Sequence, residues 1–248
     1  MGQLSMNITT KPVEYKDGKQ TCIGYMAWDE TFADPKPCVL INHAWSGLDN
    51  FAQGAAVQMA ALGYVGFCLD NYGDGVLPET VEEKQGLMMP LKDDRKALLK
   101  RLKAGIKAAG NMPEVDEKAM AALGFCFGGL CTLDMARAGI DLKAAISFHG
   151  LLDAPDLPAK KIKSKVLIAH GWDDPMAPPE HVVAIGKEMA KAKCDWQLHA
   201  YGQTTHAFMV PGADSGDGTL RHNPDSERRA WNASLDLLAE VFDQHGVS

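Results

Sequence analysis

The sequence predicts an α/β protein with a doubly wound, mostly parallel sheet that begins with an antiparallel hairpin. Three observations predict this class. Short apolar runs alternate with longer segments of helical periodicity, a tight-turn signal joins the first strands, and a glycine-flanked turn leads from an apolar run directly into a helical segment. Such alternation places parallel strands side by side, with helices on both faces of the sheet.

The hairpin lies near the start of the chain. Polar and apolar residues alternate around Val13 and Tyr15, and a second strand is predicted over residues 21–26. Asp17 and Gly18 lie between the two segments, and this pair is typical of a tight turn between antiparallel strands. We therefore expect the two segments to pair with each other.

Apolar runs and helical patterns alternate through the rest of the chain. Strands are predicted at residues 38–42, 64–69, 119–123, 144–148, 166–170 and 196–201. Helices are predicted at residues 50–62, 91–109, 127–138, 179–192 and 226–242, and irregular segments at 73–90 and 212–224. No repeat or low-complexity tract divides the chain, so we expect one α/β domain over residues 1–248.

The segment Gly-Phe-Cys-Phe-Gly, residues 124–128, has the form of a nucleophile elbow. A residue held on a tight strand-to-helix turn needs small neighbours two positions away on each side, because a Cβ atom there would collide with the packed strand and helix. Gly124 and Gly128 meet this demand. The sulfur of Cys126 would then point out at the carboxyl edge of the sheet, near backbone N–H groups that stabilise a thiolate. This arrangement predicts a site for acyl transfer.

Downstream residues supply partners for this cysteine. The loop after the predicted strand 166–170 carries Asp173 and Asp174, and the segment after strand 196–201 carries His206. The chain order nucleophile, acid, histidine is one of the orders in which such triads occur. Without these partners Cys126 would be interpreted as a packed core thiol. With them, the catalytic interpretation is favoured.

These motifs resemble the dienelactone hydrolase family, the carboxymethylenebutenolidase-like members of the α/β-hydrolase superfamily. The resemblance covers most of the chain and implies the α/β-hydrolase fold, with Cys126 as nucleophile, Asp174 as acid and His206 as base. Asp174 fits the family spacing to Pro178 better than Asp173, which remains the alternative. Other matching segments are Gly24-Tyr25, 39–43, Trp45, Gly47-Leu48, Gly63-Tyr64, 70–75 and 223–231.

The chemistry expected of these residues is nucleophilic catalysis. A free thiol has a pKa of about 8.5, so His206 must take its proton, while Asp174 fixes the histidine tautomer. The resemblance places the oxyanion hole at the backbone N–H groups of Trp45 and Phe127, where losing one donor typically costs about 2.7–4 kcal/mol of transition-state stabilisation. Trp45, Tyr72 and Trp172 lie on predicted carboxyl-end loops, so we expect Tyr72 and Trp172 to line the substrate pocket, although such aromatics also cover cores.

Two positions depart from the family pattern. Ala44 follows His43 where the family has a glutamate proposed to help the cysteine ionise, and Val210 stands four residues after His206 where the family has an arginine for the substrate carboxylate. Arg95 or Arg101 offers a possible replacement for that arginine. The resemblance therefore implies an ester or lactone hydrolase without specifying a dienelactone substrate.

Composition limits the partners. The chain is 46% hydrophobic and 23% charged with a net charge of −7, which gives no basis for binding nucleic acid or an anionic membrane surface. Residues 1–10 lack the regions of an export signal, and no apolar run is long enough to span a bilayer. None of the six cysteines forms a Cys-x-x-Cys pair, so we expect free thiols in a reduced, cytoplasmic setting.

Three histidines raise the question of a metal. His43, His149 and His170 each end or directly follow a predicted strand, but they lack the carboxylate pattern typical of zinc sites. They are better interpreted as residues that close strands near the pocket. We therefore expect neither a metal nor an organic cofactor.

Three functional hypotheses follow. The preferred one is a cysteine-dependent hydrolase of a small-molecule ester or lactone that forms a thiol acyl-enzyme. The second is a weakly or non-catalytic ligand-binding homologue, motivated by Ala44 and Val210. The third is a peroxide-sensitive thiol at Cys126.

Overall fold

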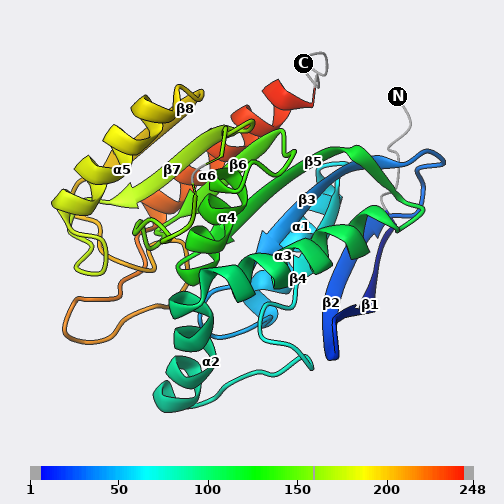
Figure 1. Cartoon of the computed structure of the whole chain (residues 1–248), viewed down its shortest axis with the longest axis horizontal. Coiled ribbons are helices and arrows are strands. Elements are labelled where there is room, and N and C mark those ends of the chain that lie inside the picture. The colour runs from blue at the N-terminus through cyan, green and yellow to red at the C-terminus, as the bar shows by residue number, and fades with distance from the viewer. Residues whose placement is uncertain (1–6, 159, 243–248) are drawn as a thin grey trace.

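The computed structural model describes residues 7–158 and 160–242, and its centre is an eight-stranded sheet with the order β1-β2-β4-β3-β5-β6-β7-β8. Residues 1–6, part of the segment inspected for an export signal, lie outside the described residues. β1 (Ile8–Asp17) and β2 (Gln20–Asp29) form an antiparallel hairpin, and β2 also pairs antiparallel with β4 (Val65–Leu69). The remaining pairs are parallel (Figure 1), which confirms the predicted sheet.

The parallel strands form from continuous apolar runs because helices cover both of their faces. Every residue of β4 and β6 is buried. These strands closely match or extend the predicted ranges, and the remaining bounds are β3 (Lys36–Asn42), β5 (Val115–Phe125), β6 (Ala144–Phe148), β7 (Lys165–Gly171) and β8 (Trp196–Tyr201).

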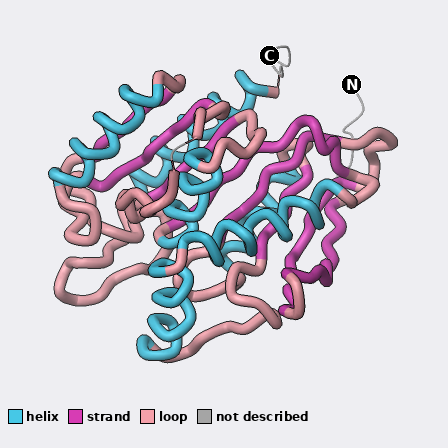
Figure 2. Tube along the Cα trace, in the orientation of Figure 1, coloured by secondary structure: helices cyan, strands magenta, loops and turns pink. Residues whose placement is uncertain are grey.

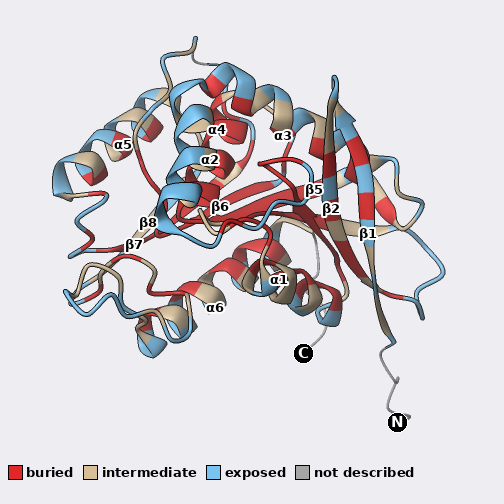
Figure 3. Cartoon of the chain, turned by 90° about the horizontal axis from the view of Figure 1, so that it is seen from below, coloured by how far each residue is buried: buried red, intermediate tan, exposed pale blue. Residues whose placement is uncertain are grey.

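Helices cover the sheet in two layers. One face carries α1 (Asn50–Ala61) and α6 (Pro224–Val241), and the other carries α3 (Arg95–Gly110), α4 (Phe127–Arg137) and α5 (Pro179–Ala192) (Figures 2 and 3). One apolar core includes Met59 of α1 and Leu238 of α6, and a second includes Leu98 of α3 and Leu130 of α4. In the part of the chain described, no helix is both long and apolar enough to cross a membrane.

The prediction that residues 73–90 are irregular holds for residues 73–80 and is wrong for residues 81–90, because helix α2 occupies Val81–Asp93. Its start carries a capping box: the Glu83 N–H donates to the Thr80 hydroxyl, and the Thr80 N–H donates to the Glu83 carboxylate, both at 3.1 Å. The Thr-x-x-Glu spacing was therefore a usable signal. Asp94 then caps α3 by accepting a hydrogen bond from the Ala97 N–H, so the predicted helix 91–109 divides there. Residues 212–224 contain only isolated bridges before α6, as predicted.

A buried ionic network ties α3, α4 and α5 together. Asp134 accepts from Arg95 at 2.6 Å and from Arg137 at 3.2 Å, and all three side chains are at most 7% exposed. Arg95 also pairs with Asp153 at 2.6 Å, and Arg137 pairs with Glu188 at 2.8 Å. Every guanidinium group in this network therefore has a carboxylate partner.

We expect Asp134→Ala to lower the free energy of unfolding by about 3–5 kcal/mol, because two buried guanidinium groups lose their shared carboxylate. Urea unfolding followed by circular dichroism measures the change. Asp141→Ala is the control, since Asp141 is 87% exposed in its contact with Lys163, and it should alter stability by less than about 0.5 kcal/mol. Similar losses in both variants would contradict the assignment.

Candidate active site

Cys126 occupies a strained turn between β5 and α4. Its backbone has φ 55° and ψ −117°, a conformation that is costly for a residue with a Cβ atom. Two hydrogen bonds hold it there: the Cys126 N–H donates to the Phe148 carbonyl at 3.1 Å, and the Cys126 carbonyl accepts from the Gly129 N–H at 2.9 Å. The side chain is 9% exposed. The turn therefore presents the sulfur at the carboxyl edge of the sheet.

The flanking glycines are required by close packing. A Cβ atom on Gly124 would lie 2.0 Å from the Gly128 carbonyl oxygen, and one on Gly128 would lie 2.0 Å from the Asn42 carbonyl oxygen. Both separations are impossible for real atoms, so α4 can approach β5 and β3 this closely only with glycine at both positions. The sequence argument for the elbow is confirmed at these two positions.

Asp174 and His206 meet beside this turn. Asp174 lies between β7 and α5, and His206 lies in the loop after β8. The Nδ1 atom of His206 is 2.7 Å from Oδ2 of Asp174, and both residues are buried. Oδ1 of Asp174 also accepts the Met176 N–H at 2.8 Å, which fixes the carboxylate. Asp173, the alternative acid, is exposed, so the structure brings Asp174 rather than Asp173 to His206.

The electrostatic setting of His206 favours its protonated form. Burial lowers the pKa of this imidazole, but the negative charge of the Cys126 thiolate and the hydrogen bond with Asp174 outweigh burial and raise the pKa to about 10. The Nε2 atom of His206 is buried and has no hydrogen-bond partner of ordinary geometry among the described residues. Nε2 is therefore the nitrogen free to exchange a proton with Cys126 or with a bound molecule.

Cys126 and His206 line one cavity of about 450 Å³. Trp45 lines it too, and the backbone N–H groups of Trp45 and Phe127 donate to no acceptor in the turns and loops of the described residues. Phe127 is the first residue of α4, where backbone N–H groups have no partner within the helix. The Trp45 N–H therefore belongs to a residue of the cavity wall, whereas Phe127 is fully buried and lies next to the lining residue Cys126. Much of the remaining wall is apolar, with Met88, Met89, Leu151, Met176, Val210 and Leu220.

The two other aromatic candidates are corrected by this geometry, because neither lines the cavity. The Tyr72 hydroxyl donates to the Trp45 carbonyl at 2.9 Å, and its ring contacts His43, so Tyr72 supports the turn that holds Trp45. Trp172 is 45% exposed, and only its backbone is engaged, through an N–H donated to Tyr201. The sequence placed both residues on suitable loops but did not determine the direction of their side chains.

The strand-ending histidines take separate positions. His43 accepts the Asn71 N–H at 3.2 Å, as expected for a residue that closes a strand. His149, with φ 37°, lines the cavity and packs edge-on against His206 at a ring separation of 5.0 Å. Burial and the nearby His206 hold the pKa of His149 well below its usual value, so it contributes an uncharged ring. Within residues 7–158 and 160–242, no group of three or more His, Cys, Asp or Glu side chains is arranged to hold a metal ion.

Sequence reasoning missed the methionine wall. Met88 and Met89 belong to α2, most of which the sequence analysis predicted as irregular. Met176 lies in the acid loop, the segment between β7 and α5 that carries Asp174. The capping box at Thr80 and Glu83 was the signal that would have predicted the start of α2, although not its place beside the cavity. Ala44 also lines the cavity, so the position of the family glutamate carries no ionisable group.

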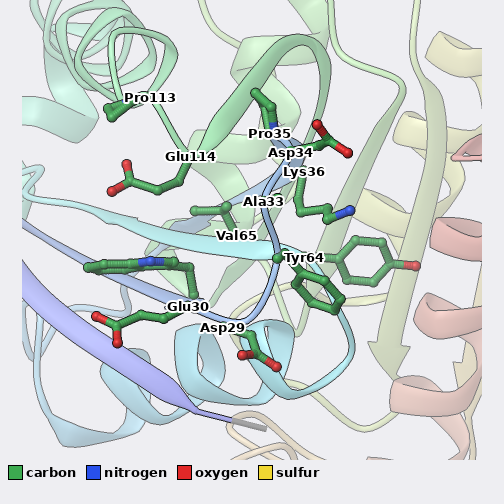
Figure 4. A pocket seen from close by; sticks show the side chains of 12 residues that line it. Asp29, Glu30, Ala33, Asp34, Pro35, Lys36, Tyr64, Val65, Pro113 and Glu114 are labelled. Atoms are coloured by element: carbon green, nitrogen blue, oxygen red, sulfur yellow. The ribbon is translucent and has the colours of Figure 1, made fainter. Parts of the chain in front are cut away.

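A second hollow of about 390 Å³ lies among the segments that precede β3, β4 and β5 (Figure 4). Asp29, Glu30, Asp34 and Glu114 surround it, without a cysteine or histidine. It lies at the amino ends of the parallel strands, whereas ligands of such sheets bind at the carboxyl ends. The cavity at Cys126 is therefore the candidate active site.

Comparison with known proteins gives matches over most of the chain. A family model described as "Dienelactone hydrolase family" matches residues 23–242. The solved structure m3DLH is 35% identical and covers 95% of this chain and 99% of its own, with a TM-score of 0.90. The dienelactone hydrolase-like promiscuous phosphotriesterase P91, from metagenomic libraries, is 34% identical with the same coverages and a TM-score of 0.90. The uncharacterized protein K02A2.1 of Caenorhabditis elegans is 35% identical over 154 residues, which are 60% of this chain and 98% of that protein.

We expect the His206 imidazole to titrate near pH 10 in the wild-type protein and at a lower pH in Cys126→Ala, because that change removes the thiolate charge. Nuclear magnetic resonance of the imidazole protons measures both values. The folded pKa lies above the unfolded value of about 6.5, so the associated stability is complete below about pH 6.5 and is lost as pH rises through about 10. An unchanged His206 pKa in Cys126→Ala would contradict the coupling.

Proposed function

This chain belongs to the dienelactone hydrolase family, and from that premise we propose that it hydrolyses a small carboxylic ester or lactone through a Cys126–His206–Asp174 triad. The observation that carries the proposal is the buried 2.7 Å hydrogen bond between His206 and Asp174, at a cavity that also exposes the elbow cysteine. The raised pKa of His206 keeps its imidazole protonated near neutral pH, so it can stabilise a thiolate formed at Cys126, the reactive form of a catalytic cysteine.

The first half of the reaction forms a thioester. The Cys126 thiolate attacks the carbonyl carbon, a C–S bond forms, and the carbonyl electron pair moves to oxygen. The N–H groups of Trp45 and Phe127 donate to this oxyanion. When the tetrahedral intermediate collapses, the ester C–O bond breaks and Nε2 of His206 gives its proton to the leaving alkoxide. Asp174 holds the imidazole through Nδ1 and stabilises its charge.

The second half releases the acid. Neutral His206 takes a proton from water as the water oxygen attacks the thioester carbon. The second tetrahedral intermediate then collapses, the C–S bond breaks, and the thiolate returns to its pair with protonated His206. The reaction needs no co-reactant besides water. The free state of all six cysteines supports a reduced, cytoplasmic setting for this thiol.

A second candidate activity is hydrolysis of a phosphotriester. P91, a relative of 34% identity over nearly the whole chain, is described as a promiscuous phosphotriesterase. The specific observation in its favour is the apolar wall of Met88, Met89 and Val210, which fits an uncharged triester. The thiolate would attack phosphorus as the P–O bond to the aryl group breaks and His206 protonates the departing aryloxide. Water deprotonated by His206 would then attack phosphorus and break the P–S bond, which releases the phosphodiester.

We expect Cys126→Ala to lower kcat/KM for p-nitrophenyl butyrate by at least about 10³-fold, because the nucleophile is lost. Stopped assays measure turnover, and mass spectrometry of the acylated wild-type protein detects the thioester. Parallel assays with paraoxon test the second activity. Cys194→Ala, which changes a partly buried cysteine outside the cavity, is the control and should retain activity. Ligand binding without acylation of Cys126 would favour the non-catalytic hypothesis, and reversible oxidation without turnover would favour the peroxide-sensitive thiol.

We expect Asp174→Asn to lower kcat by about 10³–10⁴-fold, because an amide no longer stabilises the imidazolium or fixes its tautomer. The matched control is Asp173→Asn, which alters an exposed neighbour and should change kcat less than about twofold. Both variants are compared by steady-state kinetics. The reverse order of effects would assign the acid to Asp173.

A further inference from the structure

We infer that the substrate of this cavity is an uncharged ester or lactone with an apolar acyl or alcohol group, and that the cavity selects against substrates that carry a carboxylate. The inference rests on the proposed function, because it concerns the same cavity. It follows from the wall of the cavity and from the partners of the cations that line it.

The wall offers apolar contact to a bound molecule. Met88 and Met89 approach from α2, Met176 from the acid loop, and Val210 from the loop after His206. Methionine side chains are flexible and polarizable, so they adapt to apolar groups of different shapes. A substrate whose apolar part packs against this wall binds more tightly, because removing apolar surface from water is favourable.

The charged side chains of Asp49 and Lys92 in the wall already have hydrogen-bond or ion-pair partners. Asp49 caps α1: it accepts the N–H groups of Phe51 and Ala52 at 3.1 Å and the Ser46 hydroxyl at 2.7 Å. The Lys92 ammonium lies 3.2 Å from the Asp153 carboxylate. Nδ1 of His206 is 2.7 Å from the Asp174 carboxylate. Lys92 and His206 in the wall thus each have a carboxylate partner, whereas the ammonium group of Lys84, which lies outside the lining, is 5.6 Å from the ring centroid of Trp45.

The two arginines that the sequence offered as replacements are used elsewhere. Arg95 binds Asp134 and Asp153, each at 2.6 Å, and does not line this cavity. Arg101 binds Asp17 at 2.9 Å and donates to the Asn71 carbonyl at 3.1 Å, and it also lies outside the lining. Val210, at the position of the family arginine, forms part of the apolar wall. A substrate carboxylate would thus lose its hydration without gaining a cation, which is strongly unfavourable.

The first experiment compares 4-carbamoylphenyl butyrate with 4-carboxyphenyl butyrate, which differ mainly in charge. After division by the rates of alkaline hydrolysis, we expect kcat/KM to be at least tenfold higher for the uncharged ester. Equal or faster hydrolysis of the carboxylate would overturn the inference.

Matched variants identify the origin of the preference. We expect Val210→Arg to reduce the ratio of the two kcat/KM values at least fivefold by improving the carboxylate ester, whereas Val210→Met should leave the ratio within twofold. Lys92→Met tests the rival possibility that Lys92 leaves Asp153 to bind a substrate carboxylate. A specific loss of activity toward the carboxylate ester in Lys92→Met would overturn the inference.

Binding to Cys126→Ala separates this inference from the proposed function. Butyranilide and 4-butyramidobenzoate, which carries a carboxylate on the phenyl ring, are titrated into the variant by calorimetry. We expect the uncharged anilide to bind at least tenfold more tightly. If this preference is found while the wild-type protein hydrolyses no ester, the proposed function fails and the inference holds. If hydrolysis depends on Cys126 while the two anilides bind equally, the inference alone fails.

Discussion

The close approach of α4 to the sheet is the constraint on which the site depends. The backbone of α4 lies where a Cβ atom on Gly124 would stand, and the end of β3 lies where one on Gly128 would stand, so the chain must turn sharply between β5 and α4. That turn forces Cys126 to a positive φ and aims its side chain out of the sheet. The same packing leaves the Phe127 N–H unpaired at the start of the helix. One steric requirement therefore sets both the nucleophile and one candidate oxyanion donor.

Burial strengthens the electrostatic part of the site. His206 and Asp174 are each at most 2% exposed, so their hydrogen bond is poorly screened by solvent. Burial alone would deprotonate the histidine, and the Asp174 and Cys126 charges reverse that tendency. The uncharged ring of His149 packs against His206 and adds no positive charge that would compete with this balance. The arrangement favours the protonated form of His206.

The buried ionic network bears on the proposed substrate preference, because it pairs cations that could otherwise bind a substrate carboxylate. Arg95 and Arg137 form ion pairs with Asp134, Asp153 and Glu188. These ion pairs hold α3 and α4 to the segment after β6. Asp153 also binds Lys92, the cation that lines the cavity. The network that supports the fold thus pairs the lysine that lines the cavity with a carboxylate. Under the proposed preference, the stability of the fold and the selection of substrate depend on the same carboxylates.

The sequence by itself determined the alternating strands and helices, the elbow at Cys126 and the candidate partners on later loops, because periodicity and the lack of a Cβ atom are local properties of the chain. Only the tertiary structure decided that Asp174 rather than Asp173 meets His206, that Arg95 and Arg101 pair away from the cavity, and that Tyr72 and Trp172 turn from it. It also placed the methionines of α2 on the wall. These outcomes depend on side-chain directions and on contacts between segments far apart in the sequence, which local patterns do not specify.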